Sequence, residues 1–148
     1  MRWPAALPFA LLTCAILAGC GRSDDAAMPI RGGDVSLSLV REKPYFWSSG
    51  WDVSFVVSNM PDCTRRHHAK HVGDGKFQVD VYDAGGGWIL NQGRRWYAVD
   101  VPSCEMRQFD DKPASPGTLA GSFVADDEAK LSFNKAPAAA EPAVAPAQ

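Results

Sequence analysis

Residues 51–58, with the sequence WDVSFVVS, decide the fold. Trp51, Val53, Phe55 and Val57 are apolar, and most of the residues between them are polar. Successive side chains of a β-strand point to opposite faces, so this alternation is typical of a strand with one buried face. We therefore expect a strand here, with Trp51 in the core.

The same period of two recurs on both sides of this stretch. Residues 34–39 and 76–81 alternate in the same way, as expected for strands. Three consecutive glycines at 85–87 permit a tight reversal into residues 88–90, and residues 91–93 permit a second reversal. The sequence therefore predicts an antiparallel meander of three strands in this region.

Shorter strand candidates complete the pattern. No window of a dozen residues shows the 3.6-residue period of an amphipathic helix. The fold class that follows is all-β: a single small antiparallel sandwich or barrel of about seven or eight short strands. The remaining candidate strands are residues 95–101, 104–109, 119–125 and 129–133.

Size and charge limit the classes of function. The expected β domain, residues 33–135, is large enough for one hydrophobic core and too small for two. The whole chain carries 15 Lys and Arg against 17 Asp and Glu, a net charge of −2. This balance argues against a nucleic-acid binder that relies on positive charge. Residues 136–148 are rich in Ala and Pro, and we expect a disordered tail there.

The first residues have the layout of an export signal. Met1 and Arg2 give a positive start, and an apolar run follows at residues 3–18. A membrane-spanning helix needs about 20 predominantly apolar residues, and Pro4 and Pro8 interrupt this shorter run. We therefore expect residues 1–19 to be a cleaved signal peptide.

The end of this run, Leu17-Ala18-Gly19-Cys20, resembles the lipobox of bacterial lipoproteins. In that family the cysteine thiol receives a lipid, the signal is cut just before it, and the new amino group is usually acylated. The resemblance implies that Cys20 is lipidated and begins the mature chain. Acyl chains hold a protein firmly on a bilayer because each buried methylene contributes about 0.8 kcal/mol. In signal and size, the chain is also similar to uncharacterised small proteobacterial lipoproteins.

The residues after Cys20 bear on its destination. In such lipoproteins an Asp directly after the lipidated cysteine favours retention in the inner membrane, whereas Gly21 follows here. The resemblance thus implies the outer membrane if the source has two membranes. Residues 20–32 are short, polar and interrupted by Pro and Gly, so we expect a tether between anchor and domain.

Two cysteines remain once Cys14 leaves with the signal and Cys20 takes the lipid. In an exported protein, Cys63 and Cys104 are expected to form a disulfide. It would close a loop of about 40 residues and contribute about 4 kcal/mol by loop entropy. The alternative is a metal site that uses both thiolates together with nearby histidines.

Three histidines follow Cys63 in the stretch 62–71, DCTRRHHAKH. His67, His68 and His71 are candidate ligands for zinc or copper. His67 and His71 would share a face in a helical turn, and His68 would join them in an irregular loop. Arg65, Arg66 and Lys70 argue against a metal site because they would place positive charge beside the cation. No compact metal-binding motif is present either. We favour a solvated basic loop, with contact to phosphate or anionic headgroups as a further option.

Residues 45–51, YFWSSGW, hold four aromatics around a turn. Aromatic faces suit a sugar or a peptide because they offer contact area at low entropic cost. The usual role of aromatics beside strands is to close the core. Tyr45 and Trp47 are the candidates for a surface site.

These features favour a non-enzymatic envelope lipoprotein that uses no cofactor and binds another envelope protein or a glycan. After the signal there is no nucleophile elbow and no phosphate-binding glycine loop. A nucleophilic Cys63–His67 pair would be disabled by the disulfide. The alternative is a metal-binding lipoprotein that holds zinc or copper at His67, His68 and His71.

Overall fold

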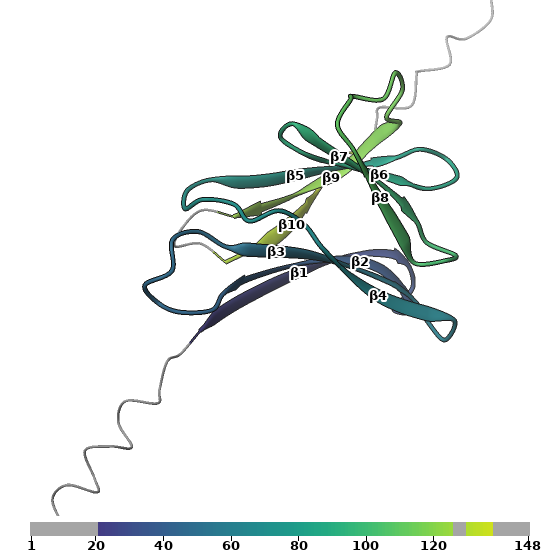
Figure 1. Ribbon diagram of the computed structural model, residues 1–148. Coiled ribbons are helices and arrows are strands. Elements are labelled where there is room, and N and C mark those ends of the chain that lie inside the picture. Colours follow the sequence, from purple (N-terminus) through teal and green to yellow (C-terminus); the bar gives the residue numbers. More distant parts are fainter. Residues whose placement is uncertain (1–20, 126–129, 138–148) are drawn as a thin grey trace, which may run out of the picture.

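In the computed structural model, which describes residues 21–125 and 130–137, two antiparallel β-sheets pack face to face (Figure 1). The all-β sandwich expected from the sequence is confirmed, and so is its single disulfide, Cys63–Cys104. Residues 1–20 and 138–148, which hold the expected signal, the lipidation site and most of the expected tail, lie outside the described residues.

The first sheet has four strands in the order β1-β2-β3-β4. β1, β2 and β3 each pair antiparallel with the strand that follows in the chain. β4 is therefore one edge of the sheet and β1 the other. Its strands are β1 (Arg22–Arg31), β2 (Val35–Lys43), β3 (Asp52–Asn59) and β4 (Cys63–His68).

The second sheet has six strands in the order β10-β9-β5-β6-β7-β8. The meander expected around the glycine-rich reversals is confirmed, because β5, β6, β7 and β8 are consecutive neighbours. The strands are β5 (Phe77–Asp83), β6 (Trp88–Gln92), β7 (Arg95–Asp100), β8 (Glu105–Phe109), β9 (Thr118–Ala125) and β10 (Ser132–Lys135).

The core lies between the two sheets and is built from alternate residues. Val53, Phe55 and Val57 of β3 are almost completely buried, as their spacing predicts. The Phe55 ring lies 5.4 Å from the ring of Tyr97 in the facing sheet. Removing these apolar surfaces from water is the main driving force for such a fold. Trp51, just before β3, is also buried.

The expected tether is instead mostly strand β1, so the domain begins at Arg22 and not at residue 33. β1 turns alternate residues inward, but its apolar signal is weak because Asp24 is one of the inward-facing residues. The carboxylate of Asp24 is neutralised by Arg41, which lies opposite it on β2. This pairing joins residues 17 positions apart, and the local sequence of β1 does not reveal it.

The expected basic loop is also a strand, β4. It pairs with β3 from Ser54↔His68 to Asn59↔Cys63. An edge strand hydrogen-bonds to a single neighbour and tolerates charged side chains, which protect it from pairing with other chains. β4 thus lacks the apolar alternation by which the inner strands were found. With β1 and β4, the described residues contain ten strands.

The two ends of the sandwich differ. We call the end where the chain enters at Gly21 the entry end; it holds the loop between β2 and β3. The opposite, distal end holds the β1–β2 and β3–β4 turns (Figure 1). β1 has ten residues, so the ends are about 30 Å apart at about 3.3 Å per residue.

Candidate functional site

Three consecutive aromatic rings project from the loop between β2 and β3. Tyr45, Phe46 and Trp47 are 51%, 77% and 65% exposed. The Tyr45 and Trp47 rings are stacked, with centroids 4.9 Å apart. The Phe46 and Trp47 rings are in an edge-to-face arrangement, with centroids 4.6 Å apart. We call residues 44–50 the aromatic loop.

This cluster is the leading candidate site because exposed apolar patches on soluble domains commonly mark interaction surfaces. The sequence singled out Tyr45 and Trp47 as surface candidates, and the structure places both of them on the surface, side by side. Phe46 was missed. Its exposure depends on the loop leaving the sheet after Lys43, which composition does not show.

The root of the aromatic loop is held firmly. Trp51 exchanges two backbone hydrogen bonds with Val72, at 2.8 and 3.0 Å. Gly50 has a φ of +76°, and a Cβ at this position would clash with the Val72 carbonyl oxygen. Only glycine combines this conformation with so close an approach. The loop therefore emerges from a fixed base.

His71 adds a second fastening at the loop root. Its Nδ1 lies 2.9 Å from an Asp52 carboxylate oxygen, and its Nε2 lies 2.9 Å from the Ser49 carbonyl oxygen. Both partners are acceptors, so both bonds form together only when the imidazole carries two protons. The hydrogen bond with Asp52 is the main cause that raises the pKa of His71, against a smaller opposing effect of desolvation.

A buried ion pair closes the entry end beneath the loop. Asp24 Oδ2 accepts hydrogen bonds from Arg41 Nε at 3.0 Å and Nη2 at 2.7 Å. The side chains of Arg41 and Asp24 are 1% and 11% exposed. The Arg41 guanidinium carbon lies 4.2 Å from the centroid of the Trp51 ring, within range of a cation–π contact. In the sequence, Arg41 continues the alternation of Leu37 and Leu39, and this spacing would have indicated that its side chain faces the core.

The chain enters the domain against this same loop. A Cβ placed on Gly21 would lie 3.0 Å from the carbonyl oxygen of Pro44 and 3.1 Å from that of Lys43. The backbone of the first described residue therefore lies close to Pro44, which precedes Tyr45. Figure 1 shows the start of β1 and the β2–β3 loop on the same side of the sandwich.

The three histidines do not converge on one site, which corrects the hypothesis of a shared metal centre. His67 donates from Nε2 to the Cys104 carbonyl oxygen at 2.7 Å, whereas His68 Nδ1 lies 3.2 Å from Ser54 Oγ. Consecutive residues of a strand face opposite sides, and His71 lies beyond the strand. Within residues 21–125 and 130–137, no group of three His, Cys, Asp or Glu side chains could hold a metal ion.

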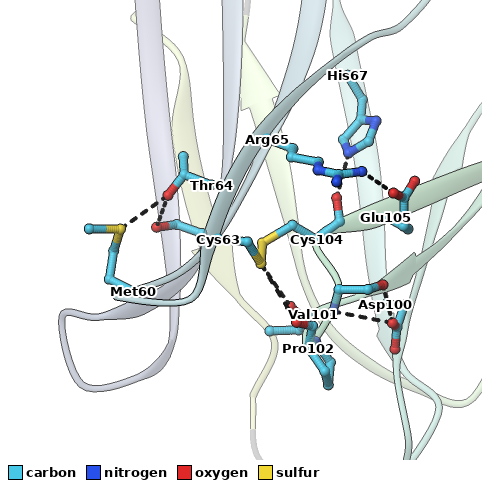
Figure 2. Close-up of a disulfide and its surroundings, with 12 residues drawn as sticks. Met60, Cys63, Thr64, Arg65, His67, Asp100, Val101, Pro102, Cys104 and Glu105 are labelled. Carbon is cyan, nitrogen blue, oxygen red and sulfur yellow. Dashed lines mark hydrogen bonds and ion pairs between the residues drawn. A yellow bond between two sulfur atoms is a disulfide. The ribbon is translucent and has the colours of Figure 1, made fainter.

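The disulfide joins the two sheets at the edge formed by β4 and β8. Cys63 begins β4 and Cys104 precedes β8, with Cα atoms 6.1 Å apart. Figure 2 shows two further links beside it, the ion pair of Arg65 with Glu105 and the hydrogen bond from His67 to Cys104. His67, one of the expected metal ligands, therefore helps to hold the two sheets together.

A cleft of about 520 Å³ opens at the distal end, within the size range of small-ligand sites. The residues at 85–87 and the carboxylates of Asp62 and Asp83 contribute to its lining. The sequence identified the glycines only as a reversal. Arg31 and Asn59 also line it, together with apolar residues from both sheets, namely Ile30, Val35, Trp88, Val101 and Pro102.

Comparisons with known proteins give no match: no family model, curated protein or solved structure is similar to this chain. In the part of the chain that the structure describes, no helix is long and apolar enough to span a membrane.

Proposed function

We propose that the protein is a lipid-anchored lipoprotein of the cell envelope whose β-sandwich is a non-enzymatic binding domain. One observation carries the proposal: β1 starts at Arg22, two residues after Cys20 of the Leu17-Ala18-Gly19-Cys20 motif. A lipid on Cys20 would hold the entry end of the sandwich directly at the bilayer surface. In a cell with two membranes, Gly21 after the lipidated cysteine favours the outer one.

The binding role is supported by two surfaces at opposite ends of the sandwich. The aromatic loop presents three exposed rings at the entry end. The distal cleft, which is lined by charged, polar and apolar residues of both sheets, lies at the other end. A protein fixed at one end of its domain leaves the opposite end accessible to another envelope protein or a glycan.

Metabolic labelling with an alkyne analogue of palmitate tests the anchor. Cells producing the wild-type protein should incorporate the label into it, and cells producing Cys20→Ser should not. Cys14→Ser is the matched control, because it removes a cysteine from the expected signal and leaves Cys20 in place. Equal labelling of Cys20→Ser and wild type, or no labelling of wild type, would refute lipidation at Cys20.

A further inference from the structure

We infer that the aromatic loop lies in the interfacial region of the bilayer on which the chain is anchored. The sandwich then stands with its entry end on the membrane and its distal cleft facing away. This inference rests on the proposed lipidation of Cys20 and assigns the lipid interface as the partner of Tyr45, Phe46 and Trp47.

The anchor and the three rings lie at the same end of the sandwich. Cys20 is bonded to Gly21, and the next residue, Arg22, pairs with Lys43 at the end of β2 that leads into the aromatic loop. The acyl chains on Cys20 would therefore leave the domain at the base of the loop that carries the rings. The residue next to Pro44 in the loop is Tyr45, so anchor and rings belong to one surface of the sandwich.

The side chains of the aromatic loop have the chemistry of a membrane interface. Tyr and Trp combine an apolar ring with one polar group, and they are enriched where hydrocarbon meets water at membrane surfaces. All three rings of the loop are more than half exposed to water. Moving them into the headgroup region removes their apolar surface from water, which is favourable. Tyr45 and Trp47 can keep their polar groups hydrated there.

The orientation of the rings is set by the root of the aromatic loop, which is fixed to the domain. Gly50 and Trp51 are packed against Val72, and His71 binds Ser49 and Asp52. The rings therefore cannot swing far from the entry end without breaking these contacts. A loop held in this way determines how the domain sits on its anchor.

A bilayer fits the aromatic loop better than a glycan or a peptide does. A glycan or peptide stacked on the rings would need open access to them, but the lipid on Cys20 brings the bilayer to the same surface. The charges beside the loop are mixed, with Lys43 paired to Asp74 and His71 to Asp52. The contact is therefore chiefly apolar, and we expect little dependence on ionic strength.

Quenching of tryptophan fluorescence by brominated lipids tests the inference. The processed, full-length protein is purified from membranes and reconstituted into vesicles of phosphatidylcholine and phosphatidylglycerol, with and without bromine on the acyl chains. Trp47 is exposed, whereas Trp51 and Trp96 are buried in the domain. Brominated lipid should quench the wild-type fluorescence, and most of this quenching should disappear in Trp47→Phe, which keeps an aromatic ring in the loop.

Trp88→Phe is the matched control, because Trp88 lines the cleft at the distal end. It should retain the lipid-dependent quenching of the wild type. If Cys20 is acylated but Trp47→Phe loses no quenching, the inference is overturned and the proposed function stands. Loss of quenching in Trp88→Phe alone would place the distal end on the bilayer and also overturn it. A protein that lacks acyl groups and does not float with the vesicles would refute the proposed function itself.

Discussion

Arg41 is the bulkiest of the fully buried side chains in the described residues. Its position on β2 is in phase with Leu37 and Leu39, so β-strand alternation directs a guanidinium into the sandwich. The charge is tolerated because Asp24 accepts two of its hydrogen bonds and Trp51 lies beneath it. Burial of a charged group is acceptable only with such partners.

Loss of the Asp24 carboxylate is therefore predicted to destabilise the domain. Asp24→Ala should lower the free energy of unfolding by about 3 kcal/mol, because the guanidinium of Arg41 stays buried without its carboxylate. Asp25→Ala is the matched control, since Asp25 is exposed on the other side of the same strand. Denaturant unfolding of both variants measures the difference. Equal effects of the two substitutions on the free energy of unfolding would contradict a stabilising role of the ion pair.

His71 is predicted to titrate above its ordinary pKa of about 6.5. The hydrogen bond with Asp52 is the main cause. A raised folded-state pKa means that the contribution to stability is fully present below the unfolded pKa and is lost as the pH rises through the folded one. The fastening of the aromatic loop should therefore loosen above that pH.

NMR titration of the His71 imidazole measures this shift. Asp52→Asn should move the pKa of His71 downward, because it removes the anionic acceptor and keeps a side chain of similar size. A wild-type His71 that titrates at or below 6.5 would contradict the double hydrogen bond to Asp52 and Ser49.

The position of β4 is determined by its pairing with β3 and by the disulfide more than by the local sequence of β4. It pairs with β3 on one side, and the disulfide holds it to the segment before β8. The ion pair of Arg65 with Glu105 spans the same gap. Together these contacts fasten the two sheets along one edge.

Breaking the disulfide should lower the free energy of unfolding, because the unfolded chain then gains conformational entropy. Cys63→Ala/Cys104→Ala is expected to reduce the free energy of unfolding by up to about 4 kcal/mol. Such a change lowers the Tm of a domain of this size by several degrees per kcal/mol. A reducing agent should lower the Tm of the wild type toward that of the double variant and leave the double variant unchanged. A wild-type Tm that does not respond to reduction would refute this contribution.

The elements that could be predicted are those whose signal is local. The alternation around Val53 and Phe55, and the glycines at 85–87, depend only on neighbouring residues, and both are confirmed as strand and reversal. The disulfide followed from counting cysteines. In each case the physical cause lies within a short stretch or in the chemistry of one residue type.

The elements that were missed depend on distant partners. In the sequence alone, Asp24 resembles a polar residue of a tether, because its partner Arg41 is distant in the chain. The histidines of β4 resemble a cluster in the sequence, but strand alternation separates their side chains in the fold. The distal cleft is assembled from turns of both sheets. Its residues are far apart in sequence and carry no common motif, so only the folded structure brings them together.

The sandwich as a whole is polarised along its strands. The entry end carries the start of the described chain, the aromatic loop and the buried ion pair, and the distal end carries the cleft about 30 Å away. A lipid on Cys20 would give this polarity a direction, with one end at the bilayer and the other available to partners.

Lipidation of Cys20 is measured most directly by mass spectrometry of protein extracted from membranes with detergent. Trypsin cleaves after Arg22, so the predicted N-terminal peptide is residues 20–22. We predict that this peptide is found with the added mass of a diacylglyceryl group on the Cys20 thiol, together with an acyl group where the amino group is also modified. A peptide that contains Cys20 with an unmodified thiol, or that continues into the preceding residues, would contradict the anchor.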